Sequence, residues 1–228
     1  GDRTDKIIIK SGVEQVSFTD AEQREISDYC AQASAIAFSS VKDQYFAESA
    51  VQQADRKVVA ANVTTSLDPD FVMEHVLPSV VFQSNADELD YLLTNGERSQ
   101  IPHEGQDLVN YISREIQSLR SENPPSYTRN MYVTIGRDGV VCSDTDGVYH
   151  VRLKDPTLQA IDAVVSKKLA STNGAGDAFF GKVAISEYRN SHQKHVTGIA
   201  MDATRNAVEH IGYMTPIPAR SFEITKLN

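Results

Sequence analysis

The stretch STNGAGDAFFGK, residues Ser171 to Lys182, sets glycines directly before an acid and an apolar run. Because Gly174 and Gly176 carry no side chain, the backbone around them can approach a ligand closely. The apolar run predicts a helix, and the first N–H groups of a helix lack partners and lie at the positive end of its dipole. The stretch therefore predicts an anion cradle of backbone amides, with Asp177 beside it.

The anion that best fits such a cradle is a phosphate, because its charge grows during transfer. Asp177 would then accept the proton of an attacking hydroxyl group. The alternative is a glycine-rich turn in which Asp177 only stabilises the start of the helix. The four residues GAGD alone do not decide between these interpretations.

Two commoner phosphate motifs are excluded. Gly176 to Lys182 reads GDAFFGK and matches a Walker A loop up to its lysine, but Val183 follows where a Ser or Thr must reach Mg²⁺. The sequence also lacks the G-x-G-x-x-G fingerprint followed by an acid about 20 residues later, so a dinucleotide-dependent enzyme is the weakest interpretation.

The composition is that of a soluble globular protein with one domain. The 228 residues are 40% hydrophobic and 23% charged. A net charge of −9 argues against a protein that holds nucleic acid by its phosphates. No apolar run approaches the ~20 residues that span a bilayer. Cys30 and Cys142 lie far apart in the sequence, which indicates buried reduced thiols and a cytoplasmic location.

Strand patterns alternate with helix patterns along the chain. Strands are predicted at 5–11, 35–40, 57–62, 80–84 and 131–136, before a hairpin over 140–151 that turns at Asp146-Gly147. Helices are predicted at 19–33, 42–54, 67–77, 86–94, 104–122, from the GAGD motif onward, and at 194–210. The segment after the hairpin is interpreted as a polar connector. Repeated βαβ units predict an α/β fold with a mostly parallel sheet covered on both faces, and ligands at the carboxyl ends of its strands.

Local signals support two of these helices. Thr19 and Glu22 have the spacing of a capping box at the start of the helix 19–33. Apolar residues recur three and four apart along 104–122, which predicts a core-facing stripe. By contrast, His192 and His195 lie on a polar stretch without an evident carboxylate partner, which favours a solvated face over a metal site.

TNGAGDAFFG resembles the C-terminal signature of the ribokinase-like, or PfkB, family of carbohydrate and nucleoside kinases. Three other segments match in the family's order: QSNADELDYL at Asn85 and Glu88, VTIGRDGVV at Thr134, Gly136 and Gly139, and DATRNAVEHIG at Asn206 and Gly212. The likeness runs from about Ile7 to the C-terminus. It implies one ribokinase-like domain over residues 1–228, with a three-layer α/β/α architecture.

The resemblance also implies roles for these residues. Asp177 would be the catalytic base, and the backbone of Gly174, Ala175 and Gly176 would form the anion hole. ATP and Mg²⁺ would be the cofactors. The residues implied around them are Asn85 and Glu88 at the phosphates and the metal ion, through water, Thr134, Gly136 and Gly139 along the nucleotide, and Asn206 near the adenine. From the residues alone, Asn85 and Glu88 also fit an Asn-capped helix, and residues 134–136 fit a strand end with a turn.

Two features depart from the family's pattern. The family usually has Asp where this chain has Ser171, and a hydroxyl is a poorer cation ligand than a carboxylate, which argues against dependence on a monovalent cation. Family members also begin with a strand that carries a substrate-binding acid, a Gly-Gly motif and lid strands. Those parts have no counterpart here, and the sequence contains no Gly-Gly dipeptide. We therefore expect exposed sheet edges beside a missing first strand.

Three kinds of chain would have such edges: a fragment of a longer protein, a homo-oligomer or rearranged chain that covers them, or a remnant that no longer catalyses. The sequence thus supports two functions of different classes. One is an ATP-dependent kinase that transfers the γ-phosphoryl group to a hydroxyl of a sugar or nucleoside, with neither nucleic acid nor membrane as a partner. The other is a non-catalytic ribokinase-like module that binds nucleotide or acts in interactions.

Overall fold

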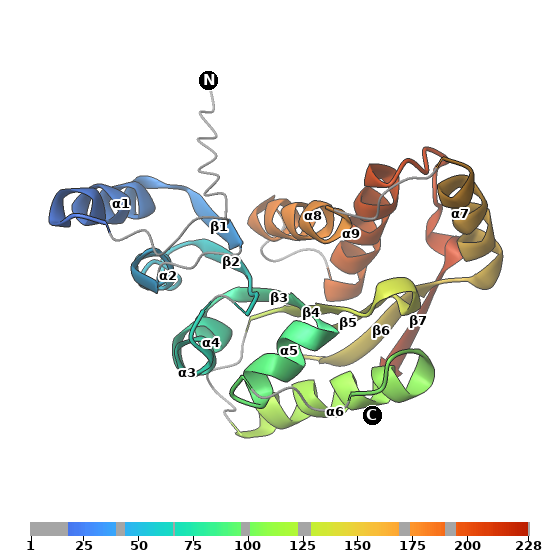
Figure 1. Cartoon of the computed structure of the whole chain (residues 1–228), viewed down its shortest axis with the longest axis horizontal. Coiled ribbons are helices and arrows are strands. Elements are labelled where there is room, and N and C mark those ends of the chain that lie inside the picture. The colour runs from blue at the N-terminus through green and yellow to red at the C-terminus, as the bar shows by residue number, and fades with distance from the viewer. Residues whose placement is uncertain are drawn as a thin grey trace.

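The computed structural model describes residues 18–39, 44–65, 67–96, 101–122, 129–168, 174–189 and 195–227. Seven strands in these ranges form one sheet, whose spatial order follows the order of the chain (Figure 1). They are β1 (Ala35–Ser39), β2 (Val58–Asn62), β3 (Val81–Asn85), β4 (Met131–Thr134), β5 (Val140–Asp144), β6 (Gly147–Leu153) and β7 (Phe222–Leu227). The strand predicted at 5–11 lies outside the described residues.

The sheet is mixed. β1 to β4 run parallel to one another, whereas β5, β6 and β7 each pair antiparallel with the preceding strand. β5 and β6 form the predicted hairpin. Because the pairing continues without interruption from β1 to β7, the described part of the sheet contains no internal gap. Its edges are the two outer strands, β1 and β7.

Helices cover both faces of the sheet. α8 (Ala175–Arg189) and α9 (Val196–His210) lie on one face, and α5 (Ala86–Leu93) and α6 (Gly105–Glu122) lie on the other (Figure 1). β3 serves both layers, because Val81 belongs to the core that contains Phe179 of α8, and Phe82 to the core that contains Ile112 of α6. This alternation is what a strand between two helical layers requires. It confirms the predicted three-layer α/β/α architecture.

The local signals of two helices are confirmed. α1 (Asp20–Gln32) begins at the predicted capping box, in which the Thr19 N–H donates to Glu22 Oε2 at 2.8 Å and the Glu22 N–H to Thr19 Oγ1 at 3.4 Å. The predicted stripe of α6 is buried through Leu108, Ile112 and Ile116. α2 (Gln44–Val51) also forms where a helix was predicted.

Three segments differ from the predictions. The helix predicted at 67–77 is α3 (Pro69–Phe71), a π-helical turn η1 (Val72–Val76) and α4 (Leu77–Ser79). Pro78 has no N–H for the carbonyl four residues earlier, which explains the widened turn. α7 (Asp155–Lys168) occupies the segment interpreted as a polar connector, and that interpretation was wrong. β7 is an additional strand, in which Phe222 is buried and residues 223–226 are exposed.

The two cysteines are buried and free, as predicted. Burial raises the pKa of the Cys30 thiol and of the Cys142 thiol, so both favour the unreactive protonated form. Within the described ranges, we find no helix that combines the length and the apolar character needed to cross a membrane.

Candidate functional site

The four parallel strands end in polar residues, which lie together at the carboxyl-terminal end of these strands. β1 ends at Ser39, β2 at Asn62, β3 at Asn85 and β4 at Thr134. Ser39 is in register with Asn62, whose Nδ2 donates to Ser39 Oγ at 3.0 Å, and Asn85 is in register with Thr134. Asn85 and Thr134, both predicted to lie at the ligand, are therefore neighbours at the carboxyl ends of the strands, where parallel sheets bind ligands.

The GAGD stretch forms the start of α8 at this site. Gly174 has a φ of +83°, which favours glycine, and its carbonyl accepts a 2.8 Å bond from the Ala178 N–H. The N–H groups of residues 175–177 precede that bond, so they have no acceptor within the helix. A side chain at Gly176 would meet nothing within 4 Å, and the carboxylate of Asp177 is exposed. The side-chain position of Gly176 and the carboxylate of Asp177 therefore face open space, and the anion cradle at this helix start stays a prediction.

The first turn of α8 rests on α9. Asn206 Nδ2 donates to the Ala178 carbonyl at 2.7 Å. His210 lies one turn further along α9, against Gly174, because a Cβ on that glycine would come within 2.7 Å of His210 Nε2. Phe179 and Phe180 are buried on the sheet side. Asn206, predicted to lie near the adenine, thus binds the first turn of the helix that begins at the predicted cradle.

Asn85 and Glu88 form the capping box that the residues alone suggested. The Asn85 N–H donates to Glu88 Oε2 at 2.8 Å, and the Glu88 N–H donates to Asn85 Oδ1 at 2.9 Å. Burial raises the pKa of Glu88, as do the negative charges of Asp87 and Asp177, whereas the Asn85 N–H lowers it. Asp177 is therefore within electrostatic reach of Glu88, so the fold brings the motifs QSNADELDYL and TNGAGDAFFG together.

Two glycines follow Thr134, and they differ in their surroundings. Gly136 has a φ of +62° and open space where a side chain would be, so its backbone is accessible at the edge. Gly139 has a φ of +103°, and a Cβ there would overlap the Val151 carbonyl oxygen of β6. The Ile135 N–H donates to the Gly139 carbonyl at 2.9 Å and closes the turn. Close packing against β6 therefore explains why residue 139 is a glycine. Gly136 differs in that the space beside its backbone is open.

The histidine prediction needs a correction. His195 Nε2 lies 3.3 Å from Asp144 Oδ2, so this histidine does have a carboxylate partner. Its Nδ1 accepts from the Thr197 N–H at 3.3 Å and caps α9. The pair joins the β5–β6 turn to α9. His192 and Ser171 lie outside the described residues.

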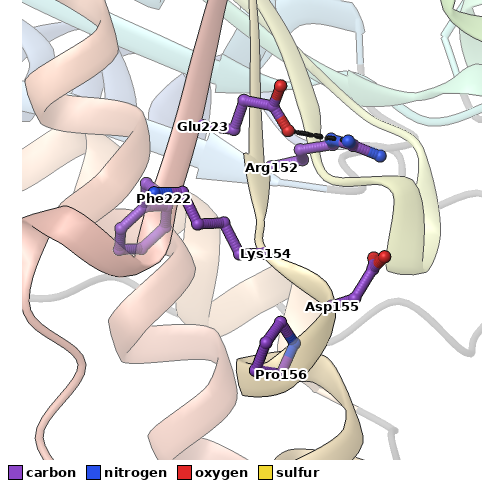
Figure 2. Close-up of a pocket in the computed structure, with 6 residues that line it drawn as sticks. All are labelled: Arg152, Lys154, Asp155, Pro156, Phe222 and Glu223. Carbon is purple, nitrogen blue, oxygen red and sulfur yellow. Dashed lines mark hydrogen bonds and ion pairs between the residues drawn. The ribbon is translucent and has the colours of Figure 1, made fainter.

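A pocket that the sequence did not suggest lies at the end of β6. β6 runs in the same direction as β4, because two antiparallel pairings separate them. β6, which ends at Leu153, and β4, which ends at Thr134, therefore have their carboxyl ends on the same side of the sheet. The cavity has a volume of about 510 Å³. Figure 2 shows the residues that line it: Arg152, Lys154, Asp155, Pro156, Phe222 and Glu223. Arg152 and Glu223 form an ion pair of 2.7 Å.

No protein-family model and no curated protein matches the sequence. Solved structures do match it. A protein of Clostridium perfringens described as a sugar kinase superposes with a TM-score of 0.61 at 11% identity, over 93% of this chain and 63% of that chain. Pyridoxal kinase of Staphylococcus aureus, in complex with pyridoxal, superposes with a TM-score of 0.61 at 11% identity, over 91% and 78%. The fold is ribokinase-like.

The ribokinase-like similarity includes ribokinase itself. Ribokinase of Cryptococcus neoformans, in complex with ADP, superposes with a TM-score of 0.57 at 18% identity, over 80% of this chain and 54% of that chain. This chain therefore spans 63% of the Clostridium protein and 54% of the Cryptococcus ribokinase. At identities this low, the superpositions establish a shared fold alone.

Proposed function

We propose that this ribokinase-like chain carries the phosphoryl-transfer part of an ATP-dependent kinase, whose acceptor is a hydroxyl group of a sugar or nucleoside. The observation that carries the proposal is the start of α8, where amides without helical acceptors lie beside the exposed carboxylate of Asp177. Fixed amides aimed at developing negative charge stabilise a transition state without reorganising during the reaction.

The proposed reaction uses the amides and the acid in sequence. The backbone N–H groups of the predicted anion hole, Gly174, Ala175 and Gly176, bind oxygens of the γ-phosphoryl group together with the N–H group of Asp177 beside them. The acceptor oxygen attacks phosphorus, its proton passes to the Asp177 carboxylate, and the bond between the γ-phosphorus and the ADP oxygen breaks. The products are ADP and the phosphorylated acceptor.

Glu88 fits the role of holding Mg²⁺. One of its carboxylate oxygens accepts from the Asn85 N–H, which leaves the other for a hydrated cation, and Mg²⁺ prefers oxygen ligands with several waters retained. The carboxylates of Glu88 and Asp177 repel each other, and a cation beside them would offset that repulsion. When bound, the ion would neutralise charge on the ATP phosphates.

The nucleotide would lie along Thr134 and Gly136 in this proposal. Thr134 ends β4 beside Asn85, and the side-chain position of Gly136 is open, so the proposal places the nucleotide against both residues. Asn206 already uses its Nδ2 for Ala178, so a contact with adenine would use its Oδ1 as an acceptor. Gly139 would contribute by shaping the turn.

A second candidate is a non-catalytic nucleotide-binding or interaction module. It is favoured by the fact that the motif residues also have structural partners: Asn85 and Glu88 cap α5, and Asn206 binds the Ala178 carbonyl. A fold could keep these residues for stability after losing the acceptor site.

Transfer of ³²P from γ-labelled ATP to a panel of sugars and nucleosides tests the kinase proposal. Asp177→Asn should lower kcat by about 10²–10⁴ while ATP binding persists. Asp20→Asn is the matched control, because Asp20 is also in the first turn of a helix, α1. An unchanged rate for Asp177→Asn would remove the general base. Binding of an ATP analogue without transfer to any acceptor would favour the non-catalytic module.

A further inference from the structure

α8 and α9 contact each other at two points, which are separated by about one helical turn along each helix. Asn206 binds the carbonyl of Ala178, and His210, four residues later, lies against Gly174, four residues earlier. Four residues span about 6 Å of helix, so the two spacings match on helices that run in opposite directions at the contact. Asn206 and His210, in the C-terminal part of α9, thus form the surface on which the N-terminal turn of α8 packs, and this surface is called the seat below.

The imidazole of His210 occupies the place where a side chain on residue 174 would be. A Cβ built on Gly174 would lie 2.7 Å from Nε2, 3.5 Å from Cε1 and 3.6 Å from Cδ2 of that ring. The ring edge therefore lies beside the Gly174 backbone, while the His210 residue as a whole is exposed. Gly174 needs this room as well as its φ of +83°, and each requirement alone favours glycine.

The seat itself is firmly held. α9 ends with bonds from the Ile211 N–H to the Ala207 carbonyl at 3.3 Å and from the Tyr213 N–H to the Val208 carbonyl at 3.2 Å. Val208 is buried, and Gly212 takes a φ of +94° where the chain leaves the helix. His210 therefore projects from a fixed turn, and its position relative to Gly174 is set by the packing of the two helices.

We propose that His210 is a positioning residue for the anion cradle, a role that rests on the proposed kinase function. By packing on Gly174, the ring limits the motion of the peptide units that lead into Ala175 and Gly176, so their N–H groups keep a common direction. Donors fixed in this way contribute most where charge develops during transfer. Loss of the ring should therefore lower kcat and leave the KM for ATP almost unchanged.

Three variants test this role. His210→Ala removes the ring, His210→Phe keeps its volume without a nitrogen, and His103→Ala is the control at another exposed histidine, which lies outside the site. We expect His210→Ala to lower kcat about tenfold, since a misplacement of about 1 Å can cost up to ~10². KM for ATP should change less than twofold, and His210→Phe should recover most of the rate.

A second readout does not depend on activity. Amide hydrogen exchange at residues 175–177 of the nucleotide-free protein should speed up in His210→Ala and return toward the wild-type rate in His210→Phe. Wild-type kcat and exchange in His210→Ala would overturn the proposal, and so would a Phe variant as slow as the Ala variant, because the nitrogen would then be the important group. If the wild type transfers no phosphate, the kinase proposal fails, while the exchange rates still test His210.

Discussion

Asn206 donates a hydrogen bond of 2.7 Å from its side-chain Nδ2 to the backbone oxygen of Ala178. The bond joins the C-terminal part of α9 to the first turn of α8, which carries the candidate anion cradle. Asn206, from the motif DATRNAVEHIG, thus helps to hold the backbone of the motif TNGAGDAFFG in place. A partly buried hydrogen bond of this kind contributes about 1 kcal/mol to stability.

Replacement of Asn206 with Ala should therefore lower the free energy of unfolding by about 0.5–1.5 kcal/mol. Urea denaturation followed by circular dichroism measures this change. Asn110→Ala, at an exposed position of α6, should stay within about 0.5 kcal/mol of the wild type. Equal effects for the two variants would mean that the bond to Ala178 does not stabilise the docking of α8 on α9.

Glu88 should make the stability depend on pH. Its pKa in the folded protein lies above the ordinary value of 4.5, so its contribution to stability is present below that pH and is lost as pH rises through the folded pKa. Glu88→Gln keeps an acceptor for the Asn85 N–H and removes the charge. The free energy of unfolding of this variant should therefore increase relative to that of the wild type from about pH 4 to about pH 7.

The same residue reports on Asp177. Because the charge of Asp177 raises the pKa of Glu88, Asp177→Asn should lower that pKa, and an NMR titration of the Glu88 carboxyl carbon measures it. Asp20→Asn provides the comparison, since Asp20 lies in α1. An identical Glu88 titration in all three proteins would contradict the proximity of the two carboxylates.

Gly139 and Gly136 form a matched pair for substitution. Ala at 139 would combine a φ of +103° with a clash against the Val151 carbonyl, so the cost should be about 2–4 kcal/mol. Ala at 136, with a φ of +62° and open space, should cost only about 1–2 kcal/mol. Thermal unfolding of the two variants gives the difference, and a larger loss for Gly136→Ala would contradict the packing assigned to this turn.

A buried hydrogen bond at the other end of β4 should also be costly to remove. The Tyr132 hydroxyl donates to Glu187 Oε1 at 2.6 Å, and both side chains are buried. Tyr132→Phe should lower the unfolding free energy by about 1.5–3 kcal/mol, because the acceptor is a carboxylate in the interior. Tyr29→Phe, at a residue that is 51% exposed, should be almost neutral in the same denaturation experiment.

The features that the sequence predicted well are short-range. The capping boxes at Thr19 and Asn85 and the apolar stripe of α6 depend on residues three or four apart, so the sequence contains all the necessary information. The start of α8 at the GAGD motif is predictable for the same reason, since glycine and the helix pattern are adjacent there.

The features that the sequence missed depend on distant contacts. Lys57 holds the end of α1 by donating to the carbonyls of Cys30, Ala31 and Ala33, more than 20 residues earlier in the chain. The His195–Asp144 pair and the seat that His210 provides for Gly174 arise only when α9 packs against the hairpin and α8. α7 looked polar because most of its described side chains are exposed.

The two flanks of the sheet differ in their protection against foreign strands. β7 presents the charged residues Glu223 and Lys226, whereas β1 consists of Ala-Ile-Ala-Phe-Ser, with the side chain of Ala37 exposed. Charged residues on an outer strand discourage intermolecular pairing. Among the described strands, β1 is therefore the one expected to pair with another chain at high concentration, and a lysine in place of Ala37 is the change most suited to keeping such preparations monodisperse.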